Sequence, residues 1–134
     1  MKNPSKKNLS QKEEAWYLAV RRLDLWIAPP DQEPYQPDSI WVYNLDLGLV
    51  QAVTVTQPGP EPAEILDLFL HALEEPPPSI QAPPHHPTHL YLEDADLLPI
   101  LKPIADAFNI EISHHPQPDV INEVVDEMAL HLSE

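Results

Sequence analysis

Three stretches in the first half of the chain have the alternation or the β-rich composition that is typical of strands. Residues 13–23 contain the run Trp-Tyr-Leu-Ala-Val, which favours a strand, although the acids before it and the arginines after it also suit a short helix. Residues 39–44 and 49–56 are rich in aromatic residues, valine and threonine, and Gly48 in the turn between them tolerates a positive φ. The pattern predicts three strands, the last two of which form a hairpin.

Two stretches carry a wide apolar face at helical spacing. Residues 63–75 follow two prolines that a first helical turn tolerates, and Pro76 ends the pattern. Residues 119–132 begin at Asp119, a good N-cap after Pro118, and keep a stripe of isoleucine, valine, methionine and leucine. We expect two helices that pack their apolar faces on a sheet.

The second half of the chain holds a strand–helix–strand unit. Residues 88–93 and 109–113 are short β-rich runs, and residues 94–108 between them have helical spacing. Consecutive strands joined by a helix must run parallel if they share a sheet, and such crossovers are right-handed. Pro99 and Pro103 lie inside the helical stretch, so we expect a break or kink there.

The predicted order of elements is βββαβαβα. This order resembles the ribonuclease H-like fold, in which an antiparallel three-stranded meander is followed by two parallel strands with crossover helices, and the resemblance covers residues 15–132. The fourth strand must find a parallel neighbour beside the meander, so we expect the strand order 3-2-1-4-5. The predicted fold class is α/β (α+β), with a five-stranded mixed sheet of ribonuclease H-like topology.

The resemblance also implies positions for acidic residues. Members of this fold place acids on the first strand, in the first helix, at the end of the fourth strand and near the last helix, where they hold two Mg²⁺ ions. The matching positions in this chain are Asp94 for the fourth strand, Glu64 or Asp67 for the helix, and Asp119, Glu123 or Asp126 for the last helix. The first strand departs from the pattern, because no acid lies between Trp16 and Leu23. Asp24 would serve only if the strand were shifted toward residues 23–27.

A second resemblance rests on short motifs spread along the chain. The motifs are Trp16, Arg21-Arg22-Leu23, Trp26-Ile27, Leu90-Tyr91-Leu92, Leu101-Lys102-Pro103-Ile104 and Asn109-Ile110-Glu111-Ile112. Together they look like a family of uncharacterised bacterial domains. Asn109 replaces a usual glycine, which is acceptable because asparagine also tolerates left-handed φ. The resemblance implies a fold and no activity.

Length, charge and the absence of cysteine narrow the classes of protein. A chain of 134 residues predicts one domain, and without cysteine it has no disulfide, thiolate metal site or cysteine nucleophile.

Residues 1–12 hold four lysines and no acid, which predicts a disordered basic tail before a single α/β domain at 13–134. Residues 23–134 hold 20 acids against one basic residue, Lys102, so we expect no nucleic-acid partner. No apolar run approaches about 18 residues and the start has no signal-peptide core, so we expect no membrane partner and a cytoplasmic location.

Proline is abundant, with 18 prolines against two glycines. The prolines cluster in the connections, where they act as stiff punctuation or, as an alternative, as polyproline II ligands for aromatic grooves. One cluster leads to His85, His86 and His89 at the start of the fourth predicted strand. Residues that follow parallel strands lie at the carboxyl edge of the sheet, so we expect these histidines at the opposite edge.

Charged and imidazole side chains are expected at the carboxyl edge of the sheet, where open α/β sheets bind ligands. The residues gathered there are Glu93, Asp94, His114 and His115, and they are joined by Arg21 and Arg22 if the first and fourth strands are parallel. The arginines would neutralise the carboxylates or, alternatively, bind an acidic partner segment through bidentate contacts. No metal site is predicted; a divalent ion, if one bound, would use Asp94, His114 and His115.

These observations favour a non-catalytic acidic interaction module. The predicted partner is an unidentified protein, and we expect no catalytic residue, no cofactor and no enzymatic activity. The alternative is a degenerate or active metal-dependent nuclease of the ribonuclease H-like kind, for which Asp24 would have to lie near Asp94, since two-metal chemistry gathers acids around ions roughly 4 Å apart. A third hypothesis, a small-molecule or metal-sensing domain, would need a deep pocket at the carboxyl edge.

Overall fold

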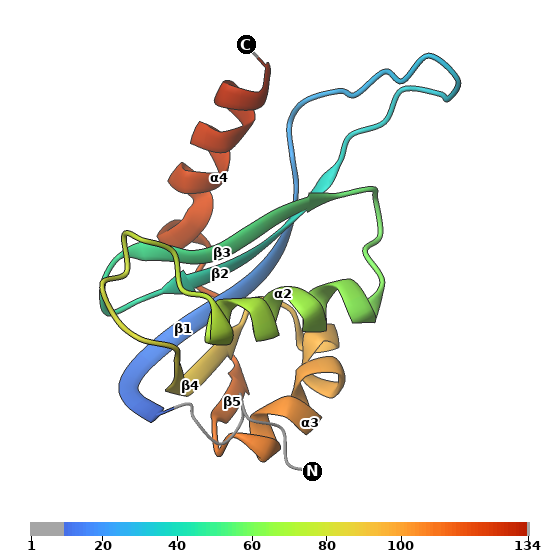
Figure 1. The fold of residues 1–134 in the computed structure, drawn as a ribbon. Helices are drawn as coiled ribbons and strands as arrows, with labels where there is room; N and C mark the ends of the chain where they lie inside the picture. Colours follow the sequence, from blue (N-terminus) through green and yellow to red (C-terminus); the bar gives the residue numbers. More distant parts are fainter. Residues whose placement is uncertain (1–9, 134) are drawn as a thin grey trace.

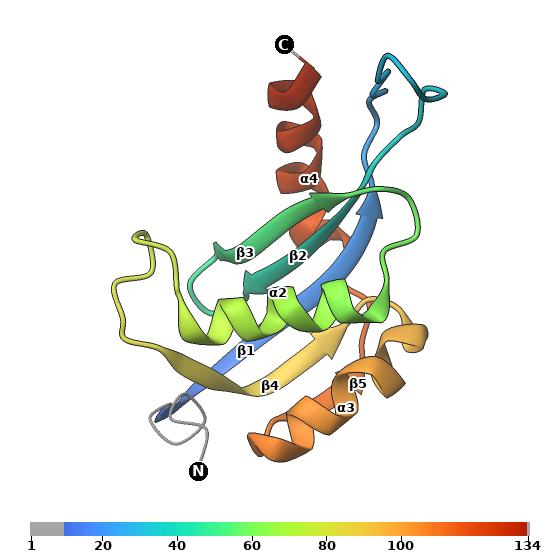
Figure 2. The ribbon, with the colours of Figure 1, turned by 45° about the vertical axis from the view of Figure 1, so that its right-hand side comes forward.

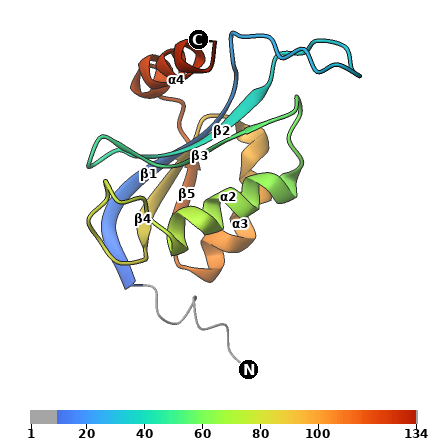
Figure 3. The ribbon, with the colours of Figure 1, turned by 45° about the horizontal axis from the view of Figure 1, so that its top comes forward.

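The computed structural model describes residues 10–133 and shows a five-stranded mixed sheet with helices on both faces (Figures 1 and 3). The strands are β1 (Ser10–Arg22), β2 (Asp38–Asn44), β3 (Leu49–Thr56), β4 (His85–Leu92) and β5 (Glu111–His114). They lie in the order β3-β2-β1-β4-β5, with β1 antiparallel to β2 and parallel to β4. The predicted fold class and strand order are confirmed.

Two helices cover one face of the sheet and a third packs on the other (Figure 3). They are α2 (Pro62–Glu74), α3 (Leu98–Ala107), which follows the 3-10 turn η1 (Ala95–Leu97), and α4 (Pro118–Ser133). The break expected in the third helical stretch is the change from η1 to α3, and Pro103 remains inside α3. α2 begins at Pro62, the proline expected in its first turn, and a capping box between Glu61 and Glu64 closes this end of the helix.

β1 is the central strand, and both of its faces are buried. Trp16 and Leu18 point into the core below α2 and α3, whereas Tyr17 and Ala19 point into the smaller core below α4. All four side chains are fully buried. A strand covered on both faces reads as a continuous apolar run, as residues 16–20 do.

Three element boundaries differ from the predictions. The disordered tail expected for residues 1–12 lies mostly outside the described residues, but Ser10–Lys12 belong to β1. β4 begins at His85 rather than at residue 88, because it pairs with the extended N-terminal part of β1. β5 covers Glu111–His114, so His114 is part of the strand.

Two turn positions adopt the left-handed conformation that the sequence allowed. Gly48, between β2 and β3, has φ 66°, and Asn109, before β5, has φ 56°. Both residue types tolerate this region at little cost.

The C-terminal half of α4 and the loop between β1 and β2 extend beyond the sheet (Figures 1 and 2). An isolated bridge between Ile27 and Tyr35 holds this loop together, and Trp26 within it is 68% exposed. Among the residues that the structure describes, no helix is both long and apolar enough to cross a lipid bilayer.

Candidate functional site

The carboxyl ends of β1 and β4 bring Arg21 and Glu93 together, as the parallel pairing of Leu18 with Leu92 predicts. The guanidinium binds both carboxylate oxygens: Nε contacts Oε1, and Nη2 donates to Oε2 at 2.6 Å. The Tyr17 hydroxyl also donates to Oε2, at 2.7 Å. A bidentate pair of this kind is among the stronger polar contacts in proteins.

The same arginine and tyrosine connect the sheet to α4. Arg21 Nη1 donates to Oδ1 of Asn122 at 2.7 Å, and the backbone N–H of Gln117 donates to the Tyr17 hydroxyl at 2.8 Å. We call these five residues (Tyr17, Arg21, Glu93, Gln117 and Asn122) the Arg21 network. It is a closed set of contacts that joins β1, β4 and the start of α4.

Burial and charge set the protonation states in the Arg21 network. Burial acts to raise the pKa of Glu93, but hydrogen bonds from Arg21 and Tyr17 outweigh it and hold that pKa below its ordinary value. Burial raises the pKa of the Tyr17 hydroxyl, and the Glu93 carboxylate raises it further although the Gln117 N–H opposes this. At neutral pH the network therefore pairs an arginine cation with a carboxylate and a neutral phenol.

Arg22 does not join the other residues predicted for this edge. Consecutive residues of a strand point to opposite faces, so Arg22 leaves the sheet on the side of α2. There its Nε donates to Oδ1 of Asp38 at 2.6 Å, and Oδ2 of Asp38 accepts the Gly59 N–H at 2.8 Å. The expectation that both arginines meet the carboxylates is therefore corrected to Arg21 alone.

Asp94, His114 and His115 lie near the same edge but do not converge. Asp94 is exposed and its carbonyl accepts the Leu97 N–H at the start of η1. His114 and His115 are exposed, and the His115 ring lies 5.4 Å from the Tyr91 ring. Within residues 10–133, no three His, Asp or Glu side chains lie close enough to hold a metal ion. The alternative metal set of these three residues is therefore not formed, and their role in binding a partner stays a prediction.

A second polar cluster lies at the opposite end of β1, where the sequence predicted no site. Oε1 of Glu14 accepts hydrogen bonds from Trp16 Nε1 at 3.1 Å, Asn44 Nδ2 at 3.2 Å and the His85 ring at 2.9 Å. The other ring nitrogen of His85 lies 2.8 Å from the Pro83 carbonyl. Asn44 and His85 are almost fully buried. We call this set the Glu14 network.

Hydrogen bonding keeps Glu14 ionised in this buried setting. Burial acts to raise the pKa of Glu14, but the hydrogen bonds from His85 and Trp16 outweigh it, so the pKa lies below its ordinary value. The carboxylate is therefore an ionised acceptor for three buried donors.

Gln51 of β3 continues the Glu14 network and leaves one donor unused. Its Oε1 accepts from Asn44 Nδ2 at 3.2 Å, whereas its Nε2 is buried and has no partner. The side chain is 1% exposed. β3 has a register shift at this point, because Ala52 pairs with Val42 and Val50 with Tyr43, so that Gln51 is an additional residue. Such a bulge turns a side chain toward a face that simple alternation would not give it.

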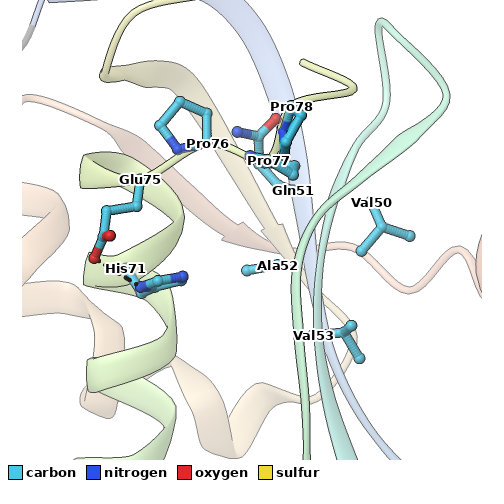
Figure 4. Close-up of a pocket in the computed structure, with 9 residues that line it drawn as sticks. All are labelled: Val50, Gln51, Ala52, Val53, His71, Glu75, Pro76, Pro77 and Pro78. Atoms are coloured by element: carbon cyan, nitrogen blue, oxygen red, sulfur yellow. Dashed lines mark ion pairs between the residues drawn. The ribbon is translucent and has the colours of Figure 1, made fainter.

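A groove beside Gln51 runs between β3 and α2. Its larger part, about 550 Å³, is lined by residues 50–53 of β3, by His71 and Glu75 of α2 and by residues 76–78. Figure 4 shows the Gln51 amide beside the prolines, with Ala52 on the α2 side of the strand and Val50 and Val53 on the other. A smaller part, about 330 Å³, is lined by residues 54–56 together with Glu64, Asp67, Leu68 and His71. We call the two parts the β3 groove.

Sequence reasoning missed most of these residues because the decisive contacts are long-range. His85 was assigned to a proline-rich loop, and Tyr17, Asn122 and Glu14 were read only as parts of a strand or a helix. The one local sign was Gln51, a polar residue inside a run of valine and threonine.

Comparison with sequence families places the chain in one of them. Residues 4–129 match the family described as a domain of unknown function (DUF6930). The chain belongs to this family. A comparison with curated proteins finds no match. The predicted resemblance to a family of uncharacterised domains is therefore confirmed.

Solved structures with the same fold include the catalytic core domain of HTLV-2 integrase in complex with magnesium. The trimeric form matches with a TM-score of 0.56 at 14% identity over 87% of this chain and 66% of that core, just under two thirds of its length. The dimeric form matches with a TM-score of 0.51 at 16% identity over 92% of this chain and 75% of that core. The ribonuclease H-like topology inferred from the element order is confirmed by these neighbours.

The prediction that the domain is not an enzyme is wrong on this comparison. The two solved structures compared above are integrase catalytic cores, so the fold carries catalysis in those proteins. At such low identity the likeness shows the fold alone.

The carboxyl edge of this chain does not fit a pair of magnesium ions. The residues that meet here on the first strand, after the fourth strand and on the last helix are Arg21, Glu93 and Asn122. The acids that the resemblance matched to the fourth strand and the last helix, Asp94 and Asp119, Glu123 or Asp126, are exposed. A guanidinium has no lone pair for a metal, and this one already occupies both oxygens of Glu93. Asp24 lines a separate hollow of about 340 Å³ with Asp126 of α4. Arg21 thus supplies a positive charge at the end of the first strand, the element on which the resemblance implied an acid.

Proposed function

We propose that this ribonuclease H-like domain binds a segment of a protein partner in the β3 groove. The observation that carries the proposal is the amide of Gln51, whose Nε2 is buried without an acceptor at the wall of the groove. Leaving a buried donor unsatisfied costs about 1–3 kcal/mol, and a bound carbonyl would recover that cost. Such groups mark places where a ligand or an ordered water is expected.

The unpaired outer edge of β3 also favours binding of a protein segment at the β3 groove. β3 is an edge strand, and no other strand in the described part of the chain pairs with its outer side. Val55 is 40% exposed and Leu49 is 37% exposed along this edge. Exposed backbone donors and acceptors beside apolar side chains are the features to which protein segments bind.

Peptides selected for binding to the wild-type domain from a random library should depend on the β3 groove. We expect His71→Trp to weaken their binding at least tenfold, because His71 lines both parts of the groove and its half-exposed side chain leaves room for a bulkier ring. Fluorescence anisotropy with the labelled peptides measures the change.

The matched control is His131→Trp, which makes the same exchange at an exposed site on α4 away from the groove. Equal loss of binding in both variants would contradict the proposal. So would a selection that enriches no peptide, or one whose peptides bind His71→Trp as tightly as the wild type.

We also propose that the partner is not a nucleic acid. Residues 23–134 carry 20 acids and one basic residue, so phosphate backbones are repelled by the folded domain. We expect no binding of duplex DNA or RNA at about 10 µM protein and 0.15 M salt, measured by anisotropy. A sub-micromolar dissociation constant would contradict this expectation.

A further inference from the structure

We infer that the segment bound in the β3 groove is basic and extended, and that it adds to the sheet as a sixth strand beside β3. This inference rests on the proposed function and specifies the class of its partner. Three features of the groove carry it: the open backbone of β3, the acids on α2, and the unpartnered amide of Gln51.

The backbone of β3 is suited to strand addition. The strand has eight residues, Leu49–Thr56, with a sequence rich in valine and threonine and free of lysine and proline. Edge strands that must stay unpaired usually carry such charges or prolines. An added segment would make main-chain hydrogen bonds with β3 and place alternate side chains toward the groove, as in other cases of strand addition.

The charge of the groove selects a basic segment. Glu64 and Asp67 line its smaller part, and Glu75 lines the larger part, where its carboxylate contacts His71 at 3.2 Å. The residues that line both parts include no lysine or arginine. A second copy of the chain is a poor occupant, because each copy carries a formal charge of −15 and the two would repel each other.

Gln51 fixes where the segment is recognised. Its Nε2 is a donor, so it takes a carbonyl oxygen, which every residue of an extended segment offers regardless of sequence. Gln51 lines the groove together with Pro77 and Pro78 (Figure 4), and because Nε2 is buried, contact with a carbonyl requires these prolines to move. Binding therefore combines a backbone contact at Gln51 with charge contacts along α2.

Three synthetic peptides test the inference. The first alternates lysine with valine over seven residues and is capped at both ends; the second has glutamate for lysine; the third has proline at its centre. At about 0.05 M salt we expect the lysine peptide to bind at least tenfold more tightly than the glutamate peptide, because surface charges are weakly screened there. The proline peptide should bind at least fivefold more weakly than the first, since proline removes a ladder hydrogen bond. Hydrogen exchange should show new protection on β3.

Gln51→Leu separates binding from folding. We expect the variant to bind the lysine peptide about fivefold more weakly, because one hydrogen bond is lost, and yet to melt at a higher temperature, because a buried unsatisfied donor is removed. Asn44 keeps Glu14 as an acceptor in this variant. The matched control is Gln57→Leu, an exposed position just beyond β3, which should change neither binding nor melting. Unchanged binding in Gln51→Leu would overturn the role given to this amide.

A charge-neutralised pair tests the basic character. Glu64→Gln with Asp67→Asn should weaken binding of the lysine peptide about fivefold, while Glu123→Gln with Glu127→Gln on the exposed side of α4 should not. Glutamine at position 64 can still complete the capping box of α2. Equal effects of the two pairs would mean that overall charge, and not the groove, attracts the peptide, and would overturn the inference.

The outcomes distinguish this inference from the proposed function. If library peptides depend on His71 but the lysine peptide binds no better than the glutamate peptide, the inference fails and the function stands. If neither library nor synthetic peptides depend on His71, both fail. A dimer that His71→Trp disrupts would show that a second copy occupies β3, which also overturns the inference.

Discussion

Arg21→Ala is expected to lower the free energy of unfolding by about 3 kcal/mol, at the lower end of the range for breaking a buried ion pair from one side. The exchange leaves Glu93, whose side chain is 13% exposed, without its counter-charge. It also removes the contact between β1 and Asn122 of α4. Urea unfolding at neutral pH, followed by circular dichroism, measures the loss.

Arg22→Ala is the matched control for this experiment. Arg22 is the next residue in the same strand, but its side chain is 54% exposed and its partner Asp38 keeps the Gly59 N–H. We expect a clearly smaller loss of stability than for Arg21→Ala. Arg21→Leu combined with Glu93→Leu should recover most of the loss, since replacing both partners removes the unpaired charge. If the two alanine variants were equally stable, the Arg21 network would not be the structural centre of this edge.

Glu14→Ala should cost about 3 kcal/mol or more, because two buried donors lose their acceptor and each unsatisfied group costs about 1–3 kcal/mol. The donors are Trp16 Nε1 and the His85 ring, whereas Asn44 Nδ2 keeps Gln51 Oε1 as an acceptor. Glu13→Ala is the matched control, since Glu13 is its exposed neighbour in β1. Equal unfolding free energies for the two variants would contradict the importance of the Glu14 network.

The pH dependence of stability provides a second readout of the same carboxylate. The folded pKa of Glu14 lies below the ordinary value of 4.5, so its contribution is fully present above about pH 4.5 and is lost as pH falls through the folded pKa. The wild type should therefore lose stability from neutral pH to about pH 3 more steeply than Glu14→Gln does. Parallel curves for the two proteins would show that Glu14 is not responsible.

The Arg21 network and the Glu14 network connect the two ends of the central strand β1 to different parts of the molecule. At the carboxyl end, Arg21 neutralises Glu93 and holds the start of α4 against the sheet. At the other end, Glu14 binds Asn44 of β2 and His85 of β4. Asn44 also donates a hydrogen bond to Gln51, which lies beside the β3 groove. A ligand on Gln51 would thus contact a network that reaches across the sheet.

The structure corrects the sequence-based interpretation most clearly at the first residues of β4. His85 and His86 follow a proline cluster, which favoured a loop, yet both are buried in the strand. The reason is the length of β1: its first residues Ser10 and Gln11 pair with His85 and His86. Local composition cannot show that a partner strand is present.

The sequence by itself determined the order and type of the elements and hence the topology. Periodicity and proline positions are local properties, and a helix between two strands leaves few arrangements, so the order β3-β2-β1-β4-β5 followed from them. Alternation along β1 also determined that the side chains of Arg21 and Arg22 point to opposite faces of the sheet, although we predicted that both would lie beside the carboxylates.

Only the tertiary structure decided which polar groups are buried and what they contact. Glu93 binds Arg21, which is separated from it by 72 positions in the sequence, and Arg21 binds Asn122 across 101 positions. The bulge that turns Gln51 toward α2 depends on how β3 pairs with β2, since it arises from a one-residue register shift. Hydrogen bonds and bulges of this kind depend on the relative position of distant strands, which no window of sequence contains, and for that reason the β3 groove emerged from the fold alone.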